Sequence, residues 1–180
     1  VGVDVQLALP GADGEARVRL SFHGATPLGT SAGSAEAVHL IDAVFERAEY
    51  LEVVQRHGKL MQEVEPGVFA FNAGVTRSEV ESTGDEALLE LFKRCERYNG
   101  RGCLNAVDHV HEFVAPLFLH KDVAGWGLFE IDRALLKLEL ETAKRRGKLP
   151  AESGQETDRE TEIRVMQRKQ NLGMNAILAV

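Results

Sequence analysis

A glycine-rich segment over residues 27–37 constrains this chain most, because its composition requires a loop between two different kinds of element. Before it, apolar residues alternate with other residues along two runs: Val1, Val3, Val5, Leu7 and Leu9, then Val18, Leu20 and Phe22. Such alternation is strand periodicity, and the residues at 10–14 between the runs are typical of a turn. The start of the chain therefore predicts an antiparallel hairpin with one buried face.

After the loop, apolar residues recur at helical spacing, which predicts a helix over residues 34–57 with the stripe Leu40, Val44, Ala48, Leu51 and Val54. Ser34 is its expected N-cap, and Gly58 is expected to end it. Three more helices are predicted at about 84–97, at 103–115 and from Trp126 or Leu128 to Arg146, the second ending at Pro116. Their apolar faces comprise Leu88, Leu91, Phe92 and Cys95; Leu104, Val107, His111 and Val114; and Phe129, Ile131, Leu135, Leu138 and Ala143.

Two intervening segments have a different character. Val64, Val68, Phe69 and Phe71 flank Pro66-Gly67 and predict a short hairpin within residues 58–82. Residues 147–162 are charged and nearly devoid of apolar side chains, which predicts an exposed insertion without fixed structure. The whole pattern is that of an α+β protein. A strand that starts at Val1 and an apolar run over 176–180 are what a fragment of a longer chain would show.

Charge and composition narrow the classes of partner. The formal net charge is −7, which argues against nucleic acid or an anionic membrane as a partner, since both attract basic surfaces. No apolar run approaches the roughly 18 residues of a membrane span, and no secretory leader is visible. Two cysteines, Cys95 and Cys103, are too few for a disulfide framework or a zinc site. We therefore expect a cytoplasmic protein with reduced thiols.

Chemistry-bearing residues are sparse outside the loop. No histidine has a second ligand at metal spacing, and His111 is expected to be hydrogen-bonded and partly buried on a helix face. Glu139, Glu141 and the acidic run 156–162 are expected on solvated faces. Ser31 lies among small residues and could present its hydroxyl and carbonyl oxygens to a hard cation. On residue type alone, a plain strand-to-helix connection with a serine cap is the favoured interpretation.

Three blocks of the sequence resemble the enolase (phosphopyruvate hydratase) family. Residues 27–37, followed by Leu40 and Asp42, are similar to the family's P-S-G-A-S-T-G-x-x-E-A motif and its extension. Residues 97–107 resemble R-Y-x-G-K-G-V-x-x-A-V, and residues 169–180 resemble K-S-x-L-G-A-N-A-I-L-G-V. A helix near 131–135 is also similar to a family helix, and the blocks occur in the family's order.

The resemblance implies a fold for residues 1–180. The enolase N-terminal domain is an antiparallel β-meander followed by a helical bundle, and its first strand would lie upstream of Val1. The catalytic β/α barrel of the family would follow the domain and is absent from this chain. Compared with the family pattern, the chain carries insertions at about 43–96 and 140–168.

The resemblance also implies a function, the reversible dehydration of 2-phosphoglycerate to phosphoenolpyruvate in glycolysis. The residues corresponding to the mobile family lid are Gly29, Thr30, Ser31, Ala32 and Gly33. Ser31 would be the metal ligand, reaching one of two Mg²⁺ ions per active site. The catalytic acid and base belong to the barrel, so no catalytic residue is expected in this chain. The family resemblance further implies a phosphorylated small-molecule substrate, a cytoplasmic lyase and a homodimer.

A second hypothesis comes from the departures from the family pattern. Leu28, Thr30, Ala32 and Ile41 replace family residues, and the insertions could dock other proteins. These features are also compatible with a non-catalytic, enolase-like scaffold or partner-binding module. Both hypotheses predict that the chain alone has no activity.

Overall fold

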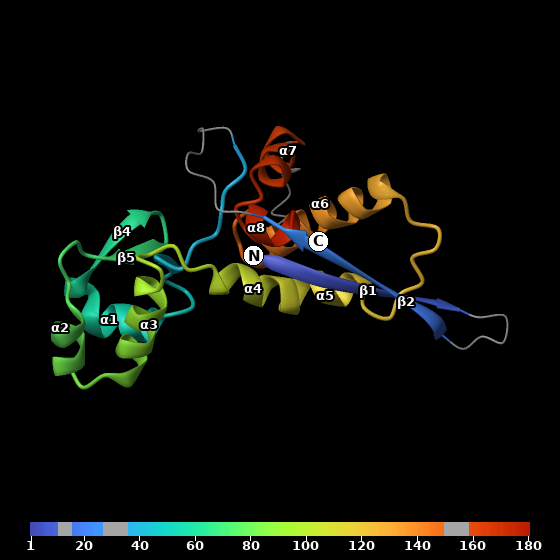
Figure 1. Cartoon of the computed structure of the whole chain (residues 1–180). Coiled ribbons are helices and arrows are strands. Elements are labelled where there is room, and N and C mark those ends of the chain that lie inside the picture. The colour runs from blue at the N-terminus through green and yellow to red at the C-terminus, as the bar shows by residue number, and fades with distance from the viewer. Residues whose placement is uncertain (11–15, 27–35, 150–158) are drawn as a thin grey trace. The chain divides into compact units, whose positions relative to one another are not determined.

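The computed structural model describes residues 1–10, 16–26, 36–149 and 159–180 (Figure 1). They form an α+β protein with two small antiparallel sheets and several helices. The chain divides into two compact units, which are described separately below. The first comprises Val1–Leu40 and Ala106–Val180, and the second comprises Ile41–Asn105. None of the helices within the described ranges is long and apolar enough to cross a membrane.

The first unit begins with the predicted hairpin, which is confirmed. Strand β1 (Gly2–Pro10) pairs antiparallel with β2 (Ala16–Ala25), and the register places Val5 opposite Phe22. Side chains along β1 alternate between half-buried and exposed, as strand periodicity requires. The predicted buried face is covered only in part, because Leu20 and Phe22 are exposed.

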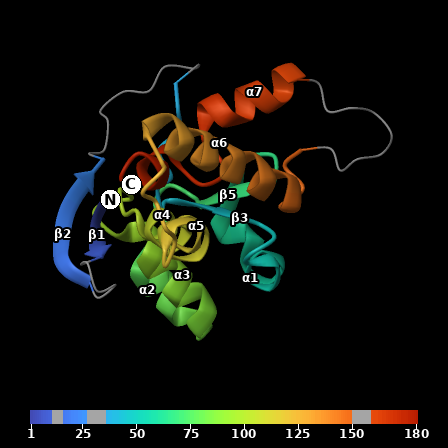
Figure 2. The same ribbon diagram turned by 90° about the vertical axis from the view of Figure 1, so that its right-hand side faces the viewer.

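Helices make up the rest of the first unit: α4 (Leu104–His109), the π-helical turn η2 (Val110–Val114), α5 (Ala115–Phe118), α6 (Leu128–Arg145), α7 (Arg159–Arg168) and α8 (Met174–Ile177). The α4 helix starts at the unit boundary. Helices α6 and α7 lie side by side (Figure 2), and Lys144 pairs with Glu162 at 2.7 Å. The apolar core of this unit is formed by Val114, Leu135, Leu172 and Ile177.

The predicted end of the 103–115 helix at Pro116 is wrong, because helical structure continues to Phe118. A proline lacks the N–H that would bond the carbonyl four residues earlier. Here the chain widens into a π-turn just before Pro116, where the Ala115 N–H bonds to the Val110 carbonyl. The widened turn also rotates the following side chains, since each π-turn contains more residues than an α-turn.

The second unit has its own sheet and core. Its elements are β3 (Val44–Glu46), α1 (Leu51–His57), the short 3₁₀ helix η1 (Gly58–Leu60), β4 (Met61–Glu65), β5 (Val68–Phe71), α2 (Arg77–Ser82) and α3 (Glu86–Glu96). The strand order is β3-β5-β4, and the β4–β5 turn at Pro66-Gly67 confirms the predicted hairpin. All four residues of the predicted α3 stripe are buried, in a core that comprises Phe45, Val53, Val54, Met61, Val80, Leu88, Leu91, Phe92 and Cys95.

The predicted helix over residues 34–57 is wrong for most of its described length. Residues 36–43 are irregular, Val44–Glu46 is a strand, and helical structure begins only at Leu51. Val44 and Phe45 are residue types that suit strands, and their backbone pairs with β5 through Ala70 and Phe69. Burial of Phe45 in the sheet core outweighs the helical spacing. The expected cap, Ser34, lies outside the described residues.

The two thiols are expected to differ sharply in reactivity. Burial is the main factor that raises the pKa of Cys95 to about 12, so this thiol stays protonated near neutral pH. Cys103 is partly exposed. An aromatic disulfide reagent should modify one thiol rapidly in the folded protein and the second only after denaturant is added. The Cys103→Ser variant should lose the fast phase. Two equally fast phases would contradict the buried position of Cys95.

Candidate functional site

The residues predicted to form a lid, Gly29, Thr30, Ser31, Ala32 and Gly33, lie outside the described residues. Both flanks of this loop are described. Residues 16–26 lead into the loop, and residues 36–40 follow it. Both flanks belong to the first unit.

The hairpin fixes the flank that precedes the loop. The Thr26 N–H donates to the Val1 carbonyl at 2.9 Å, extending the β1–β2 pairing by one step. Gly24 lies so close to the backbone carbonyl of Ala179 that a Cβ atom at this position would overlap it. Residues near the C-terminal end of the described chain therefore pack directly against the strand that leads into the loop.

The flank that follows the loop is held by the segment 168–175. The Val38 N–H donates to the Arg168 carbonyl at 2.7 Å, and the Met174 N–H donates to the Val38 carbonyl at 2.8 Å. Asn175 then bonds Leu40 twice, since its Oδ1 accepts from the Leu40 N–H and its Nδ2 donates to the Leu40 carbonyl, both at 2.9 Å. The buried side-chain amide of Asn175 thus pairs with Leu40 as a neighbouring strand would, and it satisfies both the backbone N–H and the backbone carbonyl of Leu40.

Gly173 makes this close approach possible. Its φ of +92° is a conformation that L side chains rarely adopt. A Cβ atom at this position would lie 2.7 Å from Leu40 Cβ and 2.9 Å from Asn175 Oδ1. Only glycine therefore allows segment 168–175 to approach residues 38–40 this closely.

The other side of segment 168–175 is held by Glu139, which was predicted to be solvated; that prediction is wrong. Glu139 is 0% exposed, and its two carboxylate oxygens accept from the N–H groups of Asn171 at 2.8 Å and Leu172 at 2.9 Å. Burial raises the pKa of Glu139 above its usual value, although the two N–H donors oppose this. The spacing could have indicated this burial, because Glu139 lies four residues after Leu135 and four before Ala143, on the apolar side of α6.

His109 completes the support of this segment, whereas the sequence pointed to His111. Its Nδ1 atom donates to the Leu172 carbonyl at 3.0 Å, and Arg146 donates to the Asn171 carbonyl at 3.1 Å. His109 is buried and His111 is exposed, because residues two apart on a helix point to different sides. Burial is the main factor that lowers the pKa of His109, so the ring is neutral near pH 7.

Three polar side-chain atoms near the loop flanks are buried without a hydrogen-bond partner in the described structure: Thr26 Oγ1, His39 Nδ1 and Arg168 Nε. Thr26 directly precedes the loop, and His39 and Arg168 belong to the two segments that pair beyond it. Buried polar atoms normally find partners. The loop flanks therefore carry unused hydrogen-bonding capacity, which a polar ligand could satisfy.

The second unit contains its own buried carboxylate. Asp42 is 1% exposed and accepts from the N–H groups of Leu104 at 2.8 Å and Asn105 at 2.9 Å, at the start of α4. Its own N–H donates to the Gly102 carbonyl at 2.8 Å. A Cβ atom on Gly102 would lie 2.5 Å from Asp42 Oδ2, so glycine is required here too. Asp42 acts as a helix cap from a distant part of the sequence.

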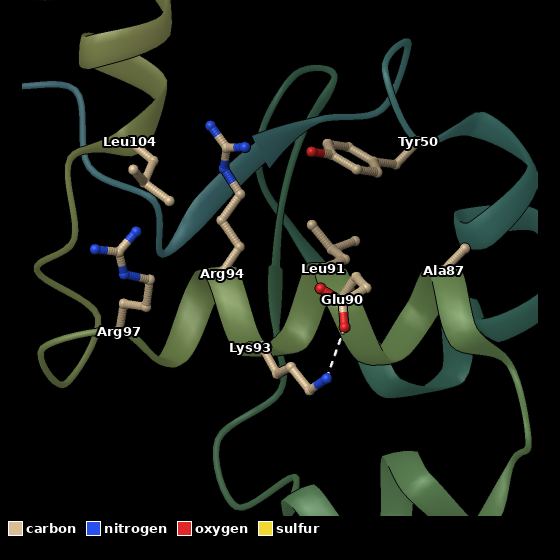
Figure 3. Close-up of a pocket in the computed structure, with 8 residues that line it drawn as sticks. All are labelled: Tyr50, Ala87, Glu90, Leu91, Lys93, Arg94, Arg97 and Leu104. Carbon is tan, nitrogen blue, oxygen red and sulfur yellow. Dashed lines mark hydrogen bonds and ion pairs between the residues drawn. The ribbon is translucent and has the colours of Figure 1, made fainter.

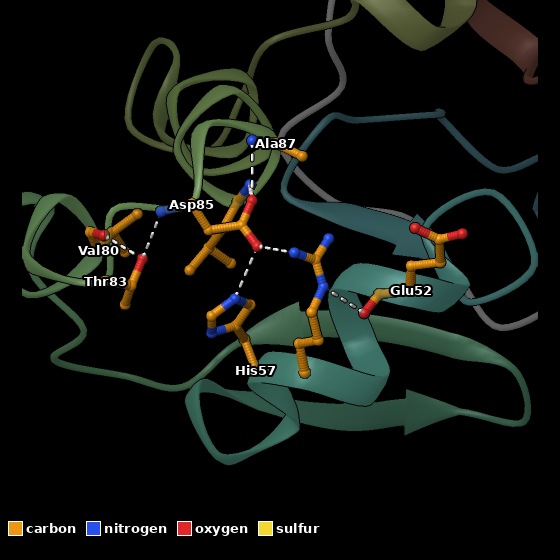
Figure 4. Close-up of polar contacts among 8 residues, drawn as sticks. Glu52, His57, Val80, Thr83, Asp85 and Ala87 are labelled. Carbon is orange, nitrogen blue, oxygen red and sulfur yellow. Dashed lines mark hydrogen bonds and ion pairs between the residues drawn. The ribbon is translucent and has the colours of Figure 1, made fainter.

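A histidine–aspartate pair in the same unit lies at the start of α3 (Figure 4). Asp85 caps α3 by accepting from the N–H groups of Ala87 and Leu88, and its other oxygen bonds His57 at 2.9 Å and Arg56 at 2.7 Å. The hydrogen bond with His57 is the main factor that lowers the pKa of Asp85. Among the contacts described for His57, none involves a hydroxyl or thiol that the ring could activate.

The described ranges contain no group of three or more histidine, cysteine, aspartate or glutamate residues placed to hold a metal ion. Glu139 and Asp42 are buried, but each is engaged with backbone N–H groups. Ser31, the predicted ligand, lies outside the described ranges.

No protein-family model matches the chain. No solved structure matches it either. The resemblance to enolases in three sequence blocks therefore stays a prediction.

Proposed function

We propose that this chain is the N-terminal, lid-bearing part of an enolase-like phosphopyruvate hydratase. The observation that supports the proposal most is the position of the residues that carry the resemblance. Gly173 and Asn175, from the third block, hold Leu40, from the first block. Gly102 and Leu104, from the second block, contact Asp42, which also belongs to the first block. Residues of the second and third blocks thus hold residues of the first block in place.

In this proposal the chain contributes a closing loop. Segments 24–26 and 36–40 are fixed to the first unit, and the loop between them would close over a phosphorylated substrate and exclude water. Ser31 would supply one magnesium ligand, and all other ligands would come from groups outside this chain. The bound metal would stabilise negative charge developing on the substrate carboxylate. Proton transfer would be carried out by the barrel of the complete protein.

The test uses the complete protein that contains this chain. Dehydration of 2-phosphoglycerate is followed by the ultraviolet absorbance of phosphoenolpyruvate, in wild type and in Ser31→Ala. Loss of a metal ligand should reduce kcat about a hundredfold or more. Ser78→Ala, at an exposed position on α2, serves as the control and should leave kcat unchanged. Equal turnover by wild type and Ser31→Ala would exclude the role given to Ser31.

One observation favours the second hypothesis, an enolase-like partner-binding module. Residues 41–105 form a compact unit with a sheet and core of its own, which is more structure than a tolerated loop insertion needs. If the complete protein shows no turnover and deletion of residues 58–96 abolishes capture of a defined partner, the module hypothesis is preferred. Turnover that survives the same deletion would favour the enzyme.

A further inference from the structure

The second unit contains a cavity of about 570 Å³, lined by Tyr50, Ala87, Glu90, Leu91, Lys93, Arg94, Arg97 and Leu104 (Figure 3). Every lining residue belongs to that unit, and most lie on α3. The volume falls in the usual range for small-molecule sites. None of these residues lies in the loop to which the enolase-like function is assigned, so a ligand in this cavity would bind apart from that loop.

Positive charge dominates the lining, although the chain as a whole is acidic. The lining contains three cationic side chains and one carboxylate. Lys93 and Glu90 pair with each other at 2.6 Å and largely cancel. Arg94 lies on the last turn of α3 and makes further contacts within the fold, and Arg97 directly follows that helix. Among the described residues, Arg97 is therefore the cationic side chain of the lining that would attract an anion.

Arg97 is the residue best placed to receive that anion. Its guanidinium lies 5.6 Å from the centre of the Tyr98 ring, and among the described residues it makes no ion pair. An aromatic face orients the planar guanidinium without using its N–H donors. Those donors suit a two-pronged contact with a carboxylate or phosphate.

The rest of the lining is apolar or aromatic. Leu91 and Leu104 contribute aliphatic surface beside the arginines, and Leu91 is buried. Tyr50 rises from the other side of the cavity, and the hydroxyl end of its ring is directed towards Arg94 (Figure 3). An apolar surface beside two guanidinium groups suits a ligand with an anionic head and an apolar body.

We propose that this cavity is a binding site for a small organic anion, with Arg97 as the main contact for the oxyanion head and Arg94 as the second. Tyr50, Leu91 and Leu104 contact its apolar body. The chemistry shared by such ligands is an organic phosphate or carboxylate with an aromatic or aliphatic group. A role of the two arginines limited to stabilising the C-terminal end of α3 is the alternative that the experiment must exclude.

The test measures binding to the full chain by two-dimensional NMR with three probes: phenyl phosphate, inorganic phosphate and phenol. Phenyl phosphate carries both the anionic head and the apolar body. The chemical-shift changes of α3 residues should therefore saturate at a lower concentration of phenyl phosphate than of inorganic phosphate or phenol. Arg97→Gln should weaken phenyl phosphate binding about tenfold or more. Arg101→Gln, at an exposed position nearby that does not line the cavity, should leave it unchanged.

Arg94 makes further contacts within the fold, so Arg94→Gln is read together with its free energy of unfolding. A folded Arg94→Gln variant with weakened binding supports the proposal. Absence of saturable phenyl phosphate binding up to about 10 mM would overturn it. So would equal binding by wild type and Arg97→Gln. Carboxylate probes of the same shape, such as benzoate, then distinguish the two kinds of head group.

Discussion

Replacing Gly173 with alanine is expected to lower the free energy of unfolding of the first unit by about 4 kcal/mol. Two effects add. The φ of +92° is strained for any L side chain, which costs about 1–2 kcal/mol. The new Cβ atom would also meet Leu40 Cβ at 2.7 Å and Asn175 Oδ1 at 2.9 Å, so the segments would separate and lose their hydrogen bonds. Because these bonds hold residues 38–40, the flank of the 27–35 loop should loosen as well.

Gly147→Ala is the matched control for this variant. Gly147 also has a positive φ, +68°, and belongs to the first unit, but a Cβ atom there would meet nothing within 4 Å. It should therefore show only the backbone effect, about 1 kcal/mol. Denaturant unfolding followed by tryptophan fluorescence measures both variants, since the single tryptophan, Trp126, lies in this unit. Equal destabilisation of the two variants would show that the approach to Leu40 is not close.

Replacing Glu139 with alanine is expected to cost a similar amount, about 4 kcal/mol. The change leaves the buried N–H groups of Asn171 and Leu172 without their acceptor, at about 1–3 kcal/mol each. Glu139→Gln should cost less, because one amide oxygen can still accept from one of them. Glu141→Ala is the control, since Glu141 is exposed on the same helix and should change stability by less than about 0.5 kcal/mol.

The pH dependence of stability gives a separate test of Glu139. Its pKa is raised in the folded protein, so the folded state binds more protons than the unfolded state at pH values above the ordinary 4.5. Stability from this group is therefore present at low pH and lost as pH rises through the folded pKa. The difference in unfolding free energy between wild type and Glu139→Gln should shrink over that range. A difference that grows with pH would mean that the N–H donors outweigh burial.

Local pattern predicted much of the secondary structure. The first hairpin, the hairpin at Pro66-Gly67, α3 and α6 follow directly from periodicity and turn residues. Each of these elements is specified by neighbours in sequence. Val44–Glu46 pairs with β5, a strand distant in sequence, and this pairing outweighs the helical spacing that predicted a helix there. Phe129, predicted on the α6 stripe, is 72% exposed, because it lies in the first turn of that helix and outside the core cluster.

The candidate site was harder to predict than the fold. Asp42, Glu139 and His109 each bond backbone groups far away in sequence, and nothing in their immediate neighbours indicates this. Comparison with the enolase pattern pointed to Asp42, Gly102, Gly173 and Asn175 without giving their roles. The structure supplies those roles. Ser31 and the rest of its loop lie outside the described residues.

The contact between Asp42 and the start of α4 has a consequence for how this chain could have grown. Residues 42 and 102–105, at the two ends of the second unit, are bonded to each other, so the intervening stretch leaves and returns at nearly one point. The entropy of closing such an excursion rises only with the logarithm of its length. Residues could therefore be added or lost between these ends at little thermodynamic cost, and a short connection could become a self-contained unit without disturbing the junction.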